Sequence, residues 1–395
     1  MNLKNCNAEE FMNRLGDKKL ICFGAGSTLM NEEYSATVIQ GLEKKIAFFV
    51  DNDTKKHGLK FKYRGCEFDI KSVSAFDTIQ ASDYVILITC AFYVEVYRQL
   101  REIEALKDVD CYLFNCVYHY PEIDIKNFLE NEIEKRHYKE YKEVLSELKL
   151  KDKHKGERCF IIGNGPSLTL EDLELLKNEV TFAANRIVRI FPKTSWRPTY
   201  YCCIDYTCYG LDHKEINEMD AALRFIPVER AFAAGKVYEE VTYYNRVVSY
   251  VGVENGGMVK NREFQFSEDV GQKVYGTKTV LYDMLQFAVY MGFKEIYLLG
   301  VDHTYRREVL EDGTVVETGA KANHFCEKEY DQDRGKVAGY ASHVYLMEQG
   351  YKKAKEVCEK RNITIKNATR GGRLEVFERV DLESVLFGTG EEKDV

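Results

Sequence analysis

The sequence has no stretch of the roughly 18 consecutive uncharged apolar residues that a membrane-spanning helix needs. Residues 1–6 lack the continuous apolar core of a secretory signal. There is no dense block of lysine and arginine, and the net charge is −8, which argues against general affinity for nucleic acid. We therefore expect a cytoplasmic protein that neither spans a membrane nor binds nucleic acid.

Cys-x-x-Cys pairs are also missing, although the chain has 12 cysteines. Scattered cysteines in a chain without a recognisable secretory signal are typical of a reducing compartment. Cys202 and Cys203 lie in an apolar strand pattern, as buried thiols commonly do. A zinc site or a disulfide framework is therefore not expected.

The sequence does contain a regular alternation of strand and helix patterns. Its 395 residues favour two domains. Within residues 1–120, the segments 19–23, 46–50 and 84–89 are almost continuously apolar. Such strands, separated by helical patterns, predict a parallel sheet covered on both faces.

Residues 121–156 are different in character, with dense charge of both signs and few apolar residues. They predict a solvated helical connector. The fold class that follows is α/β, with two Rossmann-like parallel-sheet domains, residues 1–120 and 157–395, joined by this charged connector.

Polar residues follow several strands of the second domain. Asn185, Asp205 and Asp302 each come after an apolar segment. In an open parallel sheet the ligand binds at this edge, outside the carboxyl ends of the strands. The segments that predict these strands are 159–162, 180–184, 200–204 and 295–299. Residues 210–275 give no clear pattern and are interpreted as a lid or an acceptor platform.

A glycine-rich loop joins strand 159–162 to the next helix, and it reads Gly163-Asn164-Gly165-Pro166-Ser167. Two glycines let the backbone approach an anion closely, and the start of a helix offers N–H groups and a positive dipole end. The serine hydroxyl and asparagine amide add hydrogen bonds. A tight strand-to-helix turn without a ligand explains the same pattern, and the loop alone leaves both interpretations open.

Three blocks carry a resemblance to a known family. The loop with Leu168, the residue Asn185, and the segment Gly292–Asp302 resemble the sialyltransferases of glycosyltransferase family 42. They are also similar to the broader "domain of unknown function 115" group, which includes archaeal 6-hydroxymethylpterin diphosphokinases. The order and spacing of the blocks are kept over residues 157–370.

The resemblance implies a bacterial glycosyltransferase of polysaccharide biosynthesis. Its expected reaction moves a sugar from a nucleotide donor to a glycan hydroxyl, with inversion and without a metal. The expected donor is a CMP-activated acidic sugar such as sialic acid. Because the chain is acidic overall, such a donor needs local positive charge, for which Lys278 and a helix start are candidates. The alternatives are a pterin-type diphosphokinase and a non-catalytic nucleotide-sugar-binding module.

The resemblance also implies a donor site. Asn164, Gly165 and Ser167 would hold the donor phosphate and ribose. Asn185 matches a donor-binding asparagine. Asp205 stands where the family has an asparagine, and this departure leaves the identity of the donor open.

Further donor contacts are implied near the end of the second domain. Thr277 and Thr279 match small hydroxyl residues that contact the donor. Tyr305 approximates a tyrosine that steadies the leaving phosphate, while the family's second such tyrosine has no evident counterpart. The expected donor site is completed by Gly163, Pro166 and Asp302.

The transfer also needs a base to accept the proton of the acceptor hydroxyl. Histidine suits this role because its unperturbed pKa lies near neutral pH. His324 falls where the family has its catalytic histidine, and His343 is the rival. His303, beside Asp302, is an alternative residue for orienting the substrate.

The first domain has two motifs to which we assign no metal or cofactor. Asp51-Asn52-Asp53 matches the Asp-x-Asp pattern of manganese-dependent glycosyltransferases, but it lies outside the matched domain. The loop Gly24–Gly26 is an incomplete dinucleotide fingerprint because Leu29 replaces the third glycine. We therefore expect no metal and no required cofactor, and a non-catalytic or oligomerising first domain. A homo-oligomer is left open; the expected partners are the nucleotide-sugar donor and the glycan acceptor.

Overall fold

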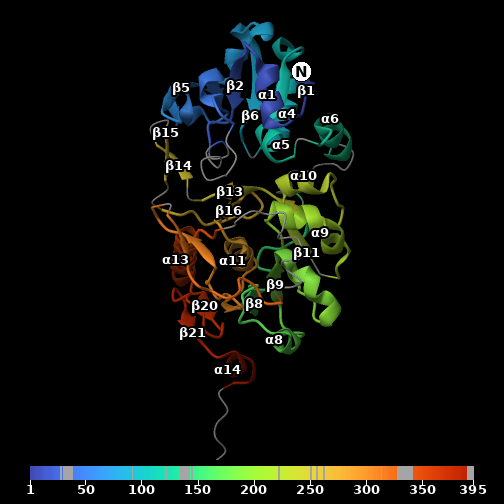
Figure 1. The fold of residues 1–395 in the computed structure, drawn as a ribbon. Helices are drawn as coiled ribbons and strands as arrows, with labels where there is room; N and C mark the ends of the chain where they lie inside the picture. The colour runs from blue at the N-terminus through green and yellow to red at the C-terminus, as the bar shows by residue number, and fades with distance from the viewer. Residues whose placement is uncertain are drawn as a thin grey trace, which may run out of the picture. The chain divides into compact units, whose positions relative to one another are not determined.

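The chain forms two compact units (Figure 1). The first contains residues 1–138, 231–237 and 247–262, and the second contains residues 139–230, 238–246 and 263–395. The computed structural model describes residues 1–26, 29, 39–90, 92–120, 122–133, 143, 146–220, 223–249, 251–254, 257–260, 263–312, 314–326 and 341–388.

The first unit is built on one sheet, which has nine strands among the described residues. In spatial order these are β1 (Asn2–Leu3), β7 (Asp110–Leu113), β6 (Tyr84–Ile88), β2 (Lys19–Phe23), β3 (Ile46–Val50), β5 (Cys66–Lys71), β4 (Lys60–Tyr63), β15 (Gly257–Lys260) and β14 (Val251–Glu254). The first six strands in this spatial order, β1 through β5, run parallel to their neighbours, whereas β4, the seventh, is antiparallel to β5. The chain leaves β2 toward β3 and later returns to its other side at β6, as in a doubly wound sheet.

The helical segments of the first unit are short. They are α1 (Ala8–Leu15), α3 (Leu42–Lys45), α4 (Tyr93–Arg101), α5 (Phe114–His119), α6 (Ile125–Asn127), α10 (Ala231–Ala234), the 3₁₀ segments η2 (Thr54–Lys56), η3 (Val73–Thr78), η4 (Ala81–Asp83) and η5 (Glu104–Leu106), and the π-helical η6 (Phe128–Ile133). Phe11 of α1 and Phe114 of α5 pack into one buried cluster with strand residues such as Leu20 and Leu87.

The boundaries differ from those drawn on the sequence. Residues 231–237 belong to the first unit, because Phe232 packs against the rings of Tyr93, Tyr120 and Phe128. Residues 247–262 belong to it because β15 pairs with β4. The expected connector begins with helical turns that also belong to the first unit, and residues 134–142 of it lie outside the described residues.

The second unit contains an eight-stranded sheet in the described part of the chain, and all its neighbouring strands run parallel. In spatial order they are β12 (Val241–Tyr244), β11 (Leu223–Pro227), β10 (Tyr200–Cys202), β9 (Thr181–Ala184), β8 (Arg158–Ile162), β17 (Glu295–Leu299), β20 (Thr364–Asn367) and β21 (Glu378–Arg379). Successive strands run outward from β8 in one direction and from β17 in the other. The order therefore reverses between β8 and β17.

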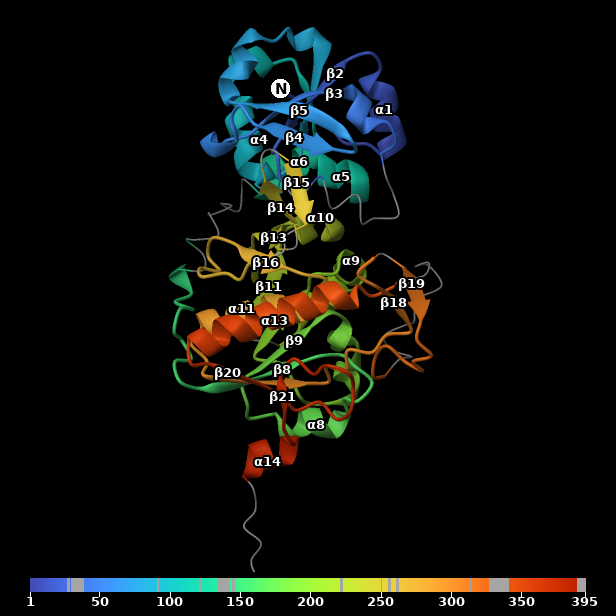
Figure 2. The same ribbon diagram turned by 90° about the vertical axis from the view of Figure 1, so that its left-hand side faces the viewer.

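Helices cover both faces of this sheet. Figures 1 and 2 show α11 and α13 on one face and α8 and α9 on the other. The helical segments of the unit and the short strands outside its large sheet have the following bounds. They are α8 (Leu170–Leu175), η7 (Asn185–Lys193), α9 (Tyr206–Glu218), η8 (Val228–Arg230), α11 (Val280–Tyr290), α13 (Val344–Lys360), α14 (Leu382–Phe387), β13 (Arg246–Val248), β16 (Val274–Gly276), β18 (Arg307–Val309) and β19 (Val315–Glu317). The predicted α/β class is confirmed: the second sheet is parallel, and the first is mainly parallel, with antiparallel pairs at β4–β5 and β14–β15.

Helix α11 is the central element of the second unit. Thr279 caps its first turn by accepting the Leu281 N–H at 3.3 Å, and Gly292, with φ of 89°, follows its end as predicted. The residues between are almost all buried, so the helix packs against both the sheet and α13. Each fully buried aliphatic or Phe side chain of this kind stabilises the fold by roughly 1.5–3 kcal/mol. Of the described helices, none is both long and apolar enough to cross a membrane.

Candidate functional site

A cavity of about 360 Å³ lies in the second unit, at the point where the strand order reverses. Open parallel sheets bind ligands at this place because the loops after the two diverging strands leave a crevice. Its walls come from the ends of β8, β9, β10 and β17 and from the start of α11. The predicted site residues among its lining are Gly163, Asn164, Gly165, Asn185, Asp205, Thr277, Thr279, Asp302, Tyr305 and His324.

The loop after β8 is held by hydrogen bonds to the end of β17. The Gly163 N–H donates to the Leu299 carbonyl at 2.8 Å, and the Gly165 N–H donates to the Gly300 carbonyl at 2.8 Å. The Ser167 hydroxyl donates to Asp302 Oδ2 at 2.7 Å, and its N–H donates to Oδ1 at 3.1 Å. These backbone groups are therefore bonded within the protein.

Both glycines of the loop are required by this packing. A Cβ on Gly163 would lie 2.3 Å from the Gly300 carbonyl oxygen, and one on Gly165 would lie 1.9 Å from Asp302 Oδ2. The tight-turn interpretation thus accounts for them. Helix α8 has only six residues, and its capping box between Thr169 and Asp172 uses N–H groups at its start. Pro166 and Ser167 are not among the described residues that line the cavity.

Asn185 and Asp205 lie at the ends of neighbouring strands and both line the cavity. Asn185 has φ of 52°, and its Oδ1 accepts the Ile204 N–H at 3.4 Å. Asp205 caps α9 by accepting the Cys208 N–H at 2.8 Å. Each side chain therefore has a structural bond, and a donor contact remains a prediction for both.

The start of α11 forms the cationic wall of the cavity. Thr277 is 3% exposed, and its hydroxyl has no hydrogen-bond partner among the described residues. Lys278 lines the cavity beside it, and burial together with the charge of Arg246 lowers the pKa of this lysine to about 8. The N–H groups and dipole of the eleven-residue helix begin at the same point.

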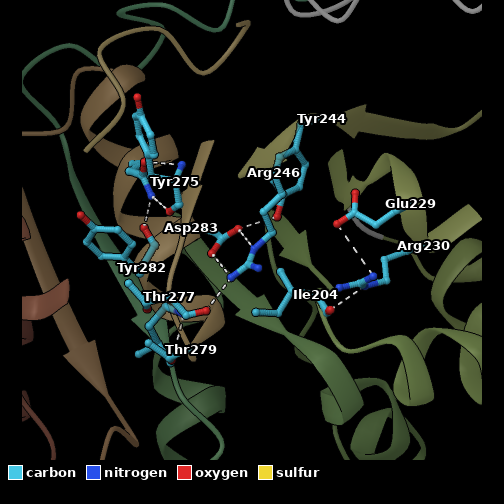
Figure 3. A network of polar contacts seen from close by, with 12 residues as sticks. Ile204, Glu229, Arg230, Tyr244, Arg246, Tyr275, Thr277, Thr279, Tyr282 and Asp283 are labelled. Atoms are coloured by element: carbon cyan, nitrogen blue, oxygen red, sulfur yellow. Dashed lines mark hydrogen bonds and ion pairs between the residues drawn. The ribbon is translucent and has the colours of Figure 1, made fainter. Parts of the chain in front are cut away.

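A buried ion pair fixes this wall (Figure 3). Arg246 Nε lies 2.7 Å from Asp283 Oδ2, and Arg246 Nη2 donates to the Thr277 carbonyl at 2.8 Å. The Tyr244 hydroxyl donates to Asp283 Oδ2 at 2.8 Å. Burial alone would lower the pKa of Arg246, but the adjacent Asp283 carboxylate raises it overall, so the guanidinium stays charged.

Arg246 is a cavity residue that sequence reasoning missed. Its pairing with Asp283 joins two segments that are far apart in the chain, which no local pattern reveals. The only hint in the sequence is the glycine at position 276. In the structure a Cβ at Gly276 would lie 2.2 Å from Arg246 Cζ. A glycine at this place is needed because the guanidinium lies against it.

Aromatic side chains also line the cavity. The Tyr305 hydroxyl donates to Met347 Sδ at 3.5 Å, and both residues line the cavity with Tyr351. Burial raises the pKa of Asp302, while the hydrogen bonds from Ser167 act in the other direction. The predicted leaving-group tyrosine is thus at the cavity, although its contact with a phosphate stays a prediction.

The two candidate bases are placed differently. His324 lines the cavity, and the neighbouring Phe325 N–H donates to the Asn164 carbonyl at 3.0 Å, which ties this segment to the glycine loop. His343 precedes α13 and is not among the described residues that line the cavity. Burial and the charge of Lys278 lower the pKa of His343 to about 4. Of the two, His324 therefore lies at the cavity, and the identity of the base stays a prediction.

The two aspartates of the acidic motif bond to other groups of the first unit. Asp51 Oδ2 accepts the Ala25 N–H at 2.8 Å and binds Lys56 Nζ at 2.9 Å, and its Oδ1 accepts the Asp53 N–H at 2.8 Å. Asp53 in turn accepts the Lys55 N–H at 3.0 Å. No group of three or more His, Cys, Asp or Glu side chains suited to a metal occurs among the described residues.

Comparisons with known proteins agree with the expected resemblance. A model of the family described as "6-hydroxymethylpterin diphosphokinase MptE-like" matches residues 135–308, so the resemblance is confirmed for this segment. No curated protein matches the sequence.

Two solved structures are similar to this chain. One is the MAf glycosyltransferase from Magnetospirillum magneticum AMB-1, with 14% identity and a TM-score of 0.33 over 95% of this chain and 61% of that one. The chain thus spans less than two thirds of that protein's length. The other is the sialyltransferase CstII from Campylobacter jejuni in complex with cytidine-5'-monophosphate, with 16% identity and a TM-score of 0.30 over 57% of this chain and 85% of that one.

Proposed function

We propose that this chain is a glycosyltransferase that moves a sugar from a nucleotide donor to a glycan hydroxyl. One observation carries the proposal. The cavity at the strand-order reversal combines a helix start, the cationic side chain of Lys278 and the hydroxyl of Thr277, which has no partner among the described residues, on one wall. This combination suits a phosphate, because N–H groups, hydroxyls and cations all favour an anion there.

The proposed donor is a CMP-activated acidic sugar such as sialic acid. The residue blocks quoted above resemble those of sialyltransferases, and Asn164, Asn185 and Asp205 line the cavity where the nucleotide would lie. Lys278 and the start of α11 supply the local positive charge that an acidic donor needs in an acidic chain, whereas the charge of Arg246 is balanced by Asp283.

The proposed reaction is a single inverting displacement. The acceptor hydroxyl attacks the anomeric carbon while His324 accepts its proton, and the bond from that carbon to the phosphate oxygen breaks. The electron pair leaves with the nucleotide, whose developing charge is stabilised by Lys278, the start of α11 and the Tyr305 hydroxyl. These groups supply the stabilisation that a metal provides in other transferases.

Thermal unfolding with a panel of nucleotides tests the proposal. CMP and CMP-N-acetylneuraminic acid should raise the melting temperature more than ATP, GTP or NAD, because a ligand that binds only the folded state stabilises it. A larger shift with UDP or GDP compounds would change the donor class. No shift with any nucleotide would contradict the proposal.

A diphosphokinase is the second candidate, because the family model that matches residues 135–308 bears that description. The same wall would then receive the phosphates of ATP, and the reaction would require magnesium. A larger shift with ATP and magnesium than with CMP compounds, lost in EDTA, would favour this candidate.

A further inference from the structure

His303 is the most unusual polar residue of the cavity. The residue lines the cavity and is only 6% exposed. Neither ring nitrogen has a hydrogen-bond partner in the part of the chain that the structure describes. Buried polar atoms in folded proteins nearly always have partners, so two unpartnered nitrogens on one ring call for an explanation.

His303 is held in a strained backbone conformation. Its φ of 55° lies in the left-handed region, which L-residues adopt with strain. The Arg373 N–H donates to the Asp302 carbonyl at 2.7 Å, and Arg373 Nη2 donates to the His303 carbonyl at 3.4 Å. Gly372 packs so closely that a Cβ there would lie 2.6 Å from the Asp302 carbonyl oxygen. The surrounding segments therefore fix this conformation.

The ring stays neutral in this environment. Burial is the main cause that lowers the pKa of His303 to about 4; the charge of Arg373 acts in the same direction and that of Glu348 opposes it. Tyr305 and Tyr351 meet the imidazole edge-on, with centroid distances of 6.2 and 5.8 Å. A neutral imidazole presents one N–H donor and one nitrogen acceptor.

We propose that His303 is a positioning residue that hydrogen-bonds a hydroxyl group of the transferred sugar. A hydroxyl both donates and accepts, and so complements a neutral imidazole, whereas phosphate and carboxylate groups only accept. Two parts of the donor would then bind at two places in the cavity: the phosphate at the start of α11 and the sugar hydroxyl at His303. This inference rests on the proposed function.

The ligand-free protein gives the first test. In His303→Phe the ring is kept and both unpartnered nitrogens are removed, so the melting temperature should stay equal or rise. The matched control is His154→Phe in the same unit. His154 Nδ1 lies 2.7 Å from Glu157 Oε2, and its Nε2 lies 2.6 Å from the Tyr200 hydroxyl, so this control should lower the melting temperature.

Binding of two probes gives the second test. CMP should bind His303→Phe as it binds the wild type, because CMP has its ribose but lacks the transferred sugar. CMP-N-acetylneuraminic acid should bind the variant roughly 10-fold more weakly, because the sugar hydroxyl is left unpaired. His303→Gln, which keeps a donor and an acceptor, should recover part of the loss.

The outcomes distinguish a failure of the proposed glycosyltransferase function from a failure of the role proposed for His303. If neither probe binds the wild type, the proposed function fails, and the role of His303 fails with it. If both probes bind the wild type and the variant equally well, only the His303 inference is overturned. A melting temperature of ligand-free His303→Phe lowered as far as in His154→Phe would identify a structural role and also overturn it.

Discussion

The two units repeat one local pattern with different surroundings. Each has a parallel sheet with a Gly-x-Gly turn after a strand at its point of reversal. In the first unit, Asp51 beside the turn is bonded to two backbone N–H groups and Lys56. In the second, the turn is also bonded internally, but Thr277 and His303 have polar atoms without partners in the described part of the chain.

This difference shows what a strand-turn-helix pattern can and cannot indicate. The pattern specifies the turn, and in both units backbone and carboxylate groups of the turn serve packing. A ligand site is indicated by polar groups that face a cavity and are left without protein partners. This criterion supports the proposed site in the second unit, and four experiments test the contrast.

The largest effect is expected for the candidate base. His324→Ala should lower kcat by about 10²–10⁴-fold, because general-base catalysis contributes that much, while donor affinity should barely change. The rate of the wild type should rise with pH as the imidazole loses its proton. Steady-state kinetics of sugar transfer measures both. The matched control is His57→Ala in the first unit, which should keep normal kcat.

His343→Ala separates the two histidines of the second unit. A well-folded but inactive His343→Ala enzyme beside a nearly normal His324→Ala enzyme would move the assignment to His343. Near-normal kcat in both would end the histidine-base mechanism.

The next largest effect is on the free energy of unfolding, when one partner of an ion pair is removed in each unit. Arg246→Met leaves the fully buried Asp283 charge unpaired and should cost about 3–5 kcal/mol of unfolding free energy. Lys56→Met should cost about 1 kcal/mol at most, because that pair is partly exposed and Asp51 keeps its backbone partners. Denaturant unfolding measures both. Equal losses would contradict the contrast between the units.

A smaller effect concerns the cationic wall. Affinity for CMP should fall as the pH rises through about 8, because Lys278 is cationic below this pKa and neutral above it. Lys278→Met should bind CMP roughly 10-fold more weakly at pH 7 and lose this pH dependence. Lys273→Met, a change of an exposed lysine near the same helix, is the control for calorimetric titration and should behave as the wild type.

The smallest expected effect is that of chelation. Transfer or donor hydrolysis should persist in excess EDTA, because Lys278, Tyr305 and the start of α11 are proposed to stabilise the leaving group. Loss of activity restored by magnesium would instead support the diphosphokinase. Restoration by manganese, abolished again in Asp51→Asn, would give the first unit a catalytic role.

The sequence predicted the sheets because their strands are strongly apolar. The segments 19–23, 46–50 and 295–299 coincide with β2, β3 and β17. The stop of α11 at Gly292 was also predicted, since a left-handed residue after a helix favours glycine. Such local features depend on neighbouring residues and can be read directly.

Long-range features escaped prediction for a physical reason. The roles of Gly163 and Gly165 depend on Gly300 and Asp302, which follow another strand, β17. The Arg246–Asp283 pair likewise joins separate elements. The roles expected for Asn185, Asp205, Thr279 and His324 in substrate binding and catalysis stay predictions, although all four lie at the cavity.

The packing of Phe232 in the first unit has a consequence for biosynthesis. A ribosome makes proteins from the N-terminus, and domains generally fold in that order as they emerge. Here the early sheet lacks the ring that fills the space among Tyr93, Tyr120 and Phe128 until residue 232 has been translated. By then β8, β9, β10 and β11 of the second unit have already been made. The nascent chain therefore holds an incomplete first unit while the second begins to form.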